Sequence, residues 1–403
     1  MEYRIMPVAE YLFLAGVFLK QFYMEESGAF QIADMFMMAA FLVLLCFKQL
    51  FIQEIDKNLF LFVSCTFIIN TFYLYFYKDG GISMSSGYLL YNFLIIIMFR
   101  TLALEPIFLS RFSLVLKLNL LTQLFLLFLH RDEMGSGGRW HGSFNDPNQF
   151  AFFVMSCFMM TVLCSQIFRN RFPLEWYLVS VILIAFSGST GMVLGMVAMT
   201  ATAILLPFFD QREKNEKIVI FVIVITIGAF LYLNRYLLLS LLEYRSNRNE
   251  VLHLAYMRIK EKVGRVSGLD GYLHERILYR IVRAPEYFIM GSGEERNDRV
   301  RWLSGEHLEM HSTMIAMCYY YGIIPYMLFL GWIHRNLSGI PGKSVCVYVG
   351  IIAEAFTLAN HRQPFFWIIF VLGSVLVRNN EIQKQEQAVE IQRYRYRIVS
   401  ERR

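Results

Sequence analysis

The sequence predicts an all-α integral membrane protein that crosses the bilayer about twelve times. Three observations support this prediction. Hydrophobic residues make up 56% of the 403 residues and charged residues only 17%, and the mean hydropathy is +0.44, which excludes an ordinary water-soluble domain. Apolar windows of roughly 20 residues, enough for a helix to span a bilayer, recur along the chain. Between the predicted spans only one sizeable segment occurs, 243–306, and it is dense in charge.

The predicted spans follow one another with short connections, and their ends are placed to within about 2 to 4 residues. The first span carries Glu10 and Lys20, and no small-residue cleavage site follows it, so we interpret it as an uncleaved anchor. The spans lie at 8–22, 30–48, 58–77, 84–104, 112–130, 149–168, 174–187, 190–208, 217–240, 308–333, 343–359 and 363–377.

The distribution of lysine and arginine predicts the orientation, because these residues are retained on the cytoplasmic side of short loops. With the N-terminus inside, most of them fall in inner loops or in the C-terminal tail, and the short outer loops hold only Lys78, Arg131, Arg139 and Arg362. Both termini are therefore expected in the cytoplasm. The net charge of +6 reflects this bias and does not indicate nucleic-acid binding.

The chain divides into four predicted parts. Residues 1–242 hold the first nine spans, 243–306 form an extracytoplasmic cap, 307–378 hold the last three spans, and 379–403 form a basic cytoplasmic tail. The cap contains apolar residues at helical spacing, as in "LHLAYMRIKEKV", which predicts short amphipathic helices at the membrane surface. All six cysteines lie inside predicted spans, so neither a disulfide framework nor a zinc site is expected.

The stretch "RWHGSFNDPNQF" places polar residues at the outer end of the sixth span. Asp146 is a good helix N-cap and Pro147 suits the first helical position. This structural reading leaves Arg139 unexplained. Its side chain, in a glycine-rich turn, is able to reach inward, and Asn148 follows at the helix start. A solvated surface arginine is the alternative.

Two histidines precede the tenth span, in "GEHLEMHSTM". His307 and His311 are four residues apart, which predicts that they share one helix face. At the N-terminus of an outward-starting helix the dipole favours the neutral imidazole, which can accept a proton. The alternative is a pair of interfacial histidines bonded to backbone or lipid phosphate.

Two further groups complete the outer polar set. In the cap, Arg276, Arg280 and Arg283 recur at helical spacing and predict one basic face that binds phosphate or lipid head groups. Glu354, roughly 9 Å inside the eleventh span, must be paired or functional. We expect it to form an ion pair with an outer arginine, and His361, seven residues later, to face the same side.

These motifs, in this order, resemble the O-antigen polymerase and O-antigen ligase superfamily of bacterial polysaccharide assembly. The resemblance covers about residues 139–325: "RWHGSFNDPNQFA", "SGSTGMVLG", the large outer loop with "RILYRIVRAPEYFIMGSG", and a His-Ser pair followed after nine residues by "GIIP". The chain departs from the family pattern at Thr190, where members often have arginine, and at Pro325.

The resemblance implies a GT-C-like membrane glycosyltransferase. Such an enzyme transfers a glycan from an undecaprenyl-pyrophosphate carrier to an acceptor hydroxyl at the outer membrane face, without metal, nucleotide sugar or other cofactor. Arg139 and Arg276 would hold the pyrophosphate, and His311 would activate the acceptor. A flippase and a chain-length regulator are the expected protein partners.

The remaining polar residues would line the substrate site: Asn148, His307, Arg280, Arg283, Glu354 and His361. The outward N-termini of the sixth and tenth helices would add partial positive charge toward the same phosphates.

The leading interpretation is a polymerase that joins lipid-linked repeat units of a capsule, exopolysaccharide or O-antigen by inverting glycosyl transfer. A ligase would differ only in the acceptor. A lipid-oligosaccharide flippase is the transport alternative, and it would call for polar groups through the midplane, where only Glu354 and Asn70 are candidates. A structural scaffold would leave the clustered histidines and arginines without a role.

Overall fold

The computed structural model describes residues 5–23, 31–50, 52–77, 81–129, 139–168, 172–210, 278–294 and 310–401, and isolated residues between 243 and 260. Every regular element in these ranges is a helix. The predicted ninth span and most of the predicted cap lie outside the described residues, as do Arg276 and His307.

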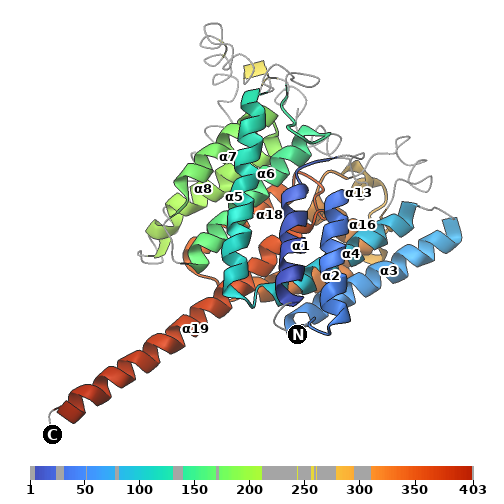
Figure 1. The fold of residues 1–403 in the computed structure, drawn as a ribbon. Coiled ribbons are helices and arrows are strands. Elements are labelled where there is room, and N and C mark those ends of the chain that lie inside the picture. Colours follow the sequence, from blue (N-terminus) through green and yellow to red (C-terminus); the bar gives the residue numbers. More distant parts are fainter. Residues whose placement is uncertain are drawn as a thin grey trace.

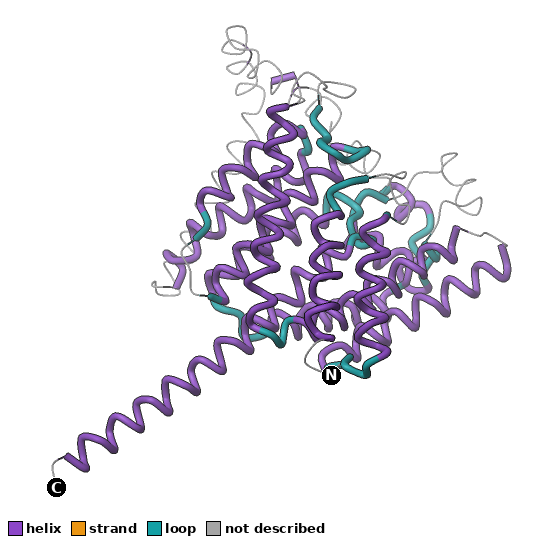
Figure 2. Tube along the Cα trace, viewed as in Figure 1, coloured by secondary structure: helices purple, strands orange, loops and turns teal. Residues whose placement is uncertain are grey.

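The helices form one bundle, from which the C-terminal helix extends (Figure 1). Figure 2 separates the helices from the loops that connect them. In chain order the elements are α1 (Ile5–Leu19), α2 (Ile32–Cys46), η2 (Glu54–Asp56), α3 (Lys57–Tyr77), α4 (Gly81–Leu102), α5 (Pro106–Leu129), α6 (Pro147–Ile167), α7 (Leu174–Ser187), α8 (Thr190–Asp210), α13 (Tyr279–Arg283), α14 (Tyr287–Met290), α16 (Thr313–Tyr321), α17 (Ile323–Leu337), η3 (Gly342–Ser344), α18 (Val345–Ala355) and α19 (Pro364–Glu401).

Five of the described helices are long and apolar enough to cross a membrane. They are the helical segments Glu54–Phe76, Ser85–Leu102, Ile107–Leu129, Pro147–Ile167 and Pro364–Gln385. Shorter apolar helices are α1, α2, α7 and most of α8. This is the helix content of a polytopic membrane protein.

The first eight predicted spans correspond to one helix each, α1 to α8; most ends agree within about three residues, and α5 begins six residues before the predicted start. The tenth does not, because a single helix over 308–333 is replaced by α16 and α17, which meet at Gly322 with φ +78°. A Cβ there would lie 2.5 Å from the Ile289 carbonyl oxygen. Close approach of the 289–293 backbone therefore requires glycine at the break.

The same backbone satisfies the carbonyl groups that the break leaves without a helical partner. Ser292 N–H donates to the Tyr319 carbonyl at 3.0 Å, and Gly293 N–H donates to the Tyr320 carbonyl at 2.7 Å. Irregular backbone is tolerated at membrane depth only where protein buries and pairs it. The segment 291–294 thus takes the place of the next helical turn.

The last two predicted spans also differ in extent. α18 ends at Ala355, four residues before the predicted end, where the Thr357 and Leu358 N–H groups both donate to the Glu354 carbonyl. A non-helical turn follows, and α19 then begins at Pro364 and continues through the predicted tail to Glu401.

The two charged residues of the first predicted span, Glu10 and Lys20, are paired in the structure. Arg111 of α5 lies 2.9 Å from Glu10, and Lys20 lies 2.7 Å from Asp34 of α2. Tyr91 donates a further hydrogen bond to Asp34 at 2.6 Å. Because each buried charge has an opposite charge from a neighbouring helix, α1 remains in the bundle.

The centre of the bundle is α6. Almost every residue from Phe150 to Ile167 is buried, which is the pattern of a helix enclosed on all sides. Helix α6 contacts α5, α7, α8, α18 and α19. The polar start of α6 is consequently fixed among the ends of these helices.

Helices α8 and α18 cross at two glycines. A Cβ on Gly195 would lie 3.0 Å from the Gly350 carbonyl oxygen, and one on Gly350 would lie 2.9 Å from the Gly195 oxygen and 2.7 Å from Met159 Cε. Small residues at a crossing let backbones approach closely, as in other membrane helix pairs. This contact sets the distance between the start of α8 and the end of α18.

We predict that Gly350→Val destabilises the protein by about 1–3 kcal/mol, the usual cost of overpacking a close contact. The measurement is the thermal midpoint in detergent by size-exclusion chromatography. Gly87→Val is the matched control, because a Cβ at Gly87 meets no atom within 4 Å. Equal midpoints for the two variants would contradict the close crossing.

Candidate functional site

The start of α6 brings Arg139, Asn148 and the end of α7 together. Arg139 Nε donates to the Ser187 carbonyl at 2.7 Å, and Nη2 donates to Asn148 Oδ1 at 2.8 Å. The Trp140 N–H donates to the Phe186 carbonyl at 2.9 Å. Arg139 is half-buried and bonded to the end of α7 and the start of α6, so of the two readings that the sequence left open, a fully solvated arginine does not apply.

Asp146 and Pro147 begin α6 as predicted. Asp146 Oδ1 accepts hydrogen bonds from the Asn148 N–H at 2.7 Å and the Gln149 N–H at 3.1 Å, and Pro147 is the first helical residue. These two amides are therefore already bonded to a carboxylate. The expectation that they would attract a substrate phosphate is wrong for this helix end.

The α7–α8 turn, which holds the Ser187 carbonyl bonded to Arg139, also contacts other polar segments. Thr190 begins α8 after Gly188, and a Cβ on Gly191 would lie 2.4 Å from Thr357 Oγ1 and 3.2 Å from Leu358 Cδ1. The α7–α8 turn thus packs against the chain between α18 and α19. Residues almost 170 positions apart in the sequence meet there because of the α8–α18 crossing.

The start of α16 is bonded to that same connection. Thr313 N–H and Oγ1–H both donate to the Leu358 carbonyl at 2.9 Å, and Asn360 N–H donates to Thr313 Oγ1 at 2.8 Å. Ser312 is the N-cap, and its Oγ accepts from the Ile315 N–H at 3.3 Å. His311 immediately precedes this cap and is half-exposed.

The helix that was predicted to carry both histidines therefore begins too late to include His311. It starts at Thr313 because the Ser312 hydroxyl caps its first turn. His311 lies in a bend outside the helix, and His307 lies outside the described residues. The predicted shared helix face is wrong for His311, whereas its position at the N-terminal end of the helix is confirmed.

Glu354 is fully buried at the end of α18, and its partner differs from the prediction. Asn360 Nδ2 donates to Glu354 Oε1 at 2.5 Å. Among the described residues, Oε2 has no hydrogen-bond partner and no arginine forms an ion pair with this carboxyl. The expected ion pair is wrong, and His361 does not share a helix face with Glu354 because α18 ends at Ala355.

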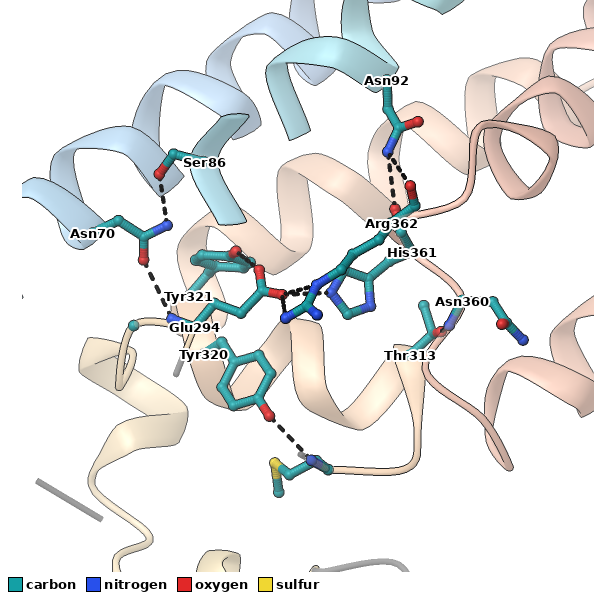
Figure 3. A network of polar contacts seen from close by, with 12 residues as sticks. Asn70, Ser86, Asn92, Glu294, Thr313, Tyr320, Tyr321, Asn360, His361 and Arg362 are labelled. Carbon is teal, nitrogen blue, oxygen red and sulfur yellow. Dashed lines mark hydrogen bonds and ion pairs between the residues drawn. The ribbon is translucent and has the colours of Figure 1, made fainter. Parts of the chain in front are cut away.

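A carboxylate that the sequence did not single out, Glu294, organises the neighbouring polar cluster (Figure 3). Arg362 Nη2 lies 2.7 Å from Glu294 Oε1, and Arg362 Nε donates to the same oxygen at 2.8 Å. His361 Nε2 lies 3.1 Å from Oε1, and Tyr321 OH donates to Oε2 at 2.5 Å. The Glu294 N–H donates to Asn70 Oδ1 at 3.2 Å.

The partners of Glu294 are themselves held by other helices. Asn70 Nδ2 of α3 donates to Ser86 Oγ of α4 at 2.8 Å. Asn92 Nδ2 donates to the His361 and Arg362 carbonyls at 3.2 Å each, and Trp367 Nε1 donates to the His361 carbonyl at 2.6 Å. The cluster therefore joins the 291–294 segment to α3, α4, α16 and α19.

Burial raises the pKa of Glu294, but the charges of Arg362 and His361 and the hydrogen bonds from His361 and Tyr321 outweigh burial. The result is a pKa well below the usual range for a glutamate. Glu294 is accordingly an anion at neutral pH, and it compensates the positive charge of Arg362.

The two described arginines of the predicted basic face have different environments. Arg280 is only 3% exposed, and its carbonyl accepts a hydrogen bond from Tyr319 OH at 3.4 Å. Arg283 is exposed and stacks over the Tyr279 ring at 5.4 Å. They do not present one common basic surface, because α13 spans only five residues and one side of it is buried.

No group of three His, Cys, Asp or Glu side chains that could hold a metal ion occurs within the described part of the chain. All six cysteines are described and free.

The contacts described above define a candidate site made of Arg139, Asn148, the α7–α8 turn, residues 311–313 and residues 357–362.

Comparisons with known proteins do not assign the chain to a family. No protein-family model matches the sequence, and no curated protein matches it significantly. The family resemblance consequently rests on the order and spacing of the motifs, and the function has to be argued from the site.

We predict that Glu294→Gln lowers the free energy of unfolding by about 2–3 kcal/mol. Removing one partner of a fully buried pair costs about 3–5 kcal/mol, and Arg362 remains 26% exposed, which reduces the loss. The measurement is chemical or thermal unfolding in detergent at pH 7. Glu286→Gln is the control, because Glu286 is an exposed glutamate at the start of α14, eight residues before Glu294.

The pH dependence of that difference follows from the lowered pKa. The Glu294 carboxylate stabilises the fold above its unfolded pKa of about 4.3, and this contribution is lost as the pH falls toward the folded pKa. The stability gap between wild type and Glu294→Gln should therefore shrink below about pH 4. A gap that stays constant or grows on acidification would contradict the ion-pair assignment.

Proposed function

We propose that this protein polymerises lipid-linked oligosaccharide repeat units into a capsular, exopolysaccharide or O-antigen polysaccharide. The donor and acceptor would be carried on undecaprenyl pyrophosphate, and the reaction would be an inverting glycosyl transfer. One observation carries the proposal: the segments that hold the family-like motifs are in contact with one another. Segment 139–148 is bonded to Ser187, and segments 187–191 and 311–313 both pack against Thr357 and Leu358.

The proposed setting is the outer face of a bacterial cytoplasmic membrane, with about twelve spans and both termini inside. The positive-inside distribution of lysine and arginine supports this orientation. In this proposed orientation, Arg139, His311 and His361 would lie on the outer side, and α19, which extends from the bundle in Figure 1, would lead the basic tail into the cytoplasm.

In the proposed reaction, Arg139 contacts the donor pyrophosphate. A lipid-linked donor brings two phosphates to the membrane interface, where a fixed guanidinium is the side chain best suited to bind them. The Ser187 carbonyl and Asn148 orient Arg139 through two of its nitrogen atoms. Because the first α6 amides are bonded to Asp146, the proposal assigns phosphate contact to arginine and not to this helix end.

His311 is the proposed general base. The acceptor hydroxyl attacks the anomeric carbon of the donor sugar and gives its proton to the imidazole. The bond from the anomeric carbon to the pyrophosphate oxygen breaks, and the carrier pyrophosphate leaves with the electron pair. His311 is half-exposed beside the capped start of α16, so it is accessible to an acceptor.

The cluster around Glu294 would support this site without entering the reaction. His361 and Glu354, which we expected to touch substrate, are buried and bonded to Glu294 and Asn360. Their proposed role is to fix the turn 357–362 that contacts α8 and α16. A ligase would use the same residues with a different acceptor, and neighbouring genes for glycosyltransferases and a flippase would favour the polymerase.

We predict that His311→Ala reduces polymer formation by about 100-fold or more, as expected when a general base is removed. The measurement is the length distribution of the cell-surface polysaccharide on a gel, at equal protein level in the membrane. His334→Ala is the control, because His334 is an exposed histidine in the last turn of α17. Normal chain growth in His311→Ala would reject the assignment.

We also predict that Arg139→Lys abolishes chain growth, because lysine keeps the charge but loses the planar donors that contact Ser187, Asn148 and phosphate. The same gel measures it, and Arg335→Lys, at an exposed position of α17, is the matched control. Full activity of Arg139→Lys would mean that only the positive charge is required.

A further inference from the structure

A pocket of about 210 Å³ lies at the opposite end of the bundle from the candidate site. It is lined by residues of α19, of the end of α4 and the α4–α5 turn, and of the segment before η2. Its lining includes Gln53, Arg100, Leu104, Ser374, Arg378 and Ile382. None of these residues contributes to the site around Arg139.

A buried guanidinium forms the polar floor of the pocket. Arg100 is 2% exposed, and its Nε lies 2.7 Å from Asp56 Oδ2. Its Nη1 donates to Ser374 Oγ at 2.7 Å, and its Nη2 donates to Asn336 Oδ1 at 2.6 Å. Asp56 compensates the charge of Arg100, so this arginine fixes the shape of the floor.

The rim carries a second arginine that is not compensated. Arg378 is exposed, and it forms no ion pair with any other described residue. With Arg100 and Asp56 cancelling, the pocket has one net positive charge. Asn379 beside it donates its Nδ2–H to the Val375 carbonyl at 2.9 Å, which turns the amide carbonyl end away from its own helix backbone.

The pocket also has an apolar wall. Leu104 is 38% exposed and Ile382 is 42% exposed. Both lie at the ends of apolar segments long enough to cross a membrane, Ser85–Leu102 and Pro364–Gln385. The pocket therefore lies at the depth where lipid head groups meet acyl chains, with a cation on one side and hydrocarbon on the other.

We propose that this pocket binds the phosphate-bearing head group of an anionic phospholipid, with Arg378 at the phosphate and Leu104 and Ile382 against the first part of an acyl chain. A single phosphate matches the one uncompensated charge, and the volume accommodates a head group. The bound lipid would stabilise the junction of α4, α5 and α19. The assignment does not depend on the function of the Arg139 site.

The test is native mass spectrometry of the full-length protein in detergent, titrated separately with phosphatidylglycerol, phosphatidylcholine and inorganic phosphate. Phosphatidylglycerol should bind best, and Arg378→Gln should weaken it by about tenfold, the loss of one charge-assisted contact. Arg335→Gln removes an exposed arginine near the end of α17 that does not line the pocket, and it should change binding less than about twofold.

A second variant separates the pocket from general surface charge. Leu104→Trp keeps every charge but fills the apolar side, and it should also weaken phosphatidylglycerol binding, with the protein eluting normally on size exclusion. Equal weakening by Arg335→Gln and Arg378→Gln, or no effect of Leu104→Trp, would overturn the pocket. If inorganic phosphate displaced the lipid at equal concentration, the ligand of the pocket would be a free anion and not a lipid, which would overturn the proposal.

Discussion

The ion pair between Glu294 and Arg362 is the interaction on which the polar end of the bundle depends. It joins two non-helical segments, 291–294 and 356–363, inside an apolar frame where an unpaired polar group costs several kcal/mol. Tyr321, His361 and Asn70 complete the coordination of the carboxylate and of its backbone N–H. Because these partners come from α3, from α16 and from the 356–363 segment, the network fixes these parts relative to one another.

The second constraint is the glycine crossing of α8 and α18, which brings the α7–α8 turn against Thr357 and Leu358. Hydrogen bonds from Thr313 to Leu358 then position the start of α16, with His311 just before it. Arg139 approaches from the other side through Ser187 and Asn148. Polar side chains lie against the ends of apolar helices here because three non-helical segments meet at one place.

Local patterns in the sequence were sufficient for the helices α1 to α8 and for the cap of α6. Apolar windows predicted α1 to α8, and Asp146 and Pro147 predicted the start of α6. The break at Gly322 was missed because its cause is the backbone of residues 289–293, which periodicity does not report. Glu294 was missed for the same reason: its partner Arg362 is 68 positions away, and only the short "GSGE" run marks it. Glu354 was correctly expected to need a partner, but the early end of α18 made that partner Asn360.

The central claim is that this arrangement transfers glycan from a pyrophosphate carrier. The most direct measurement is reconstitution of the purified wild-type protein in liposomes with lipid-linked repeat units as the only sugar source. The account predicts a ladder of products that grow by whole repeat units, together with release of the carrier pyrophosphate. Repeat units that stay unextended in the presence of folded protein, whether or not they cross the bilayer, would contradict it.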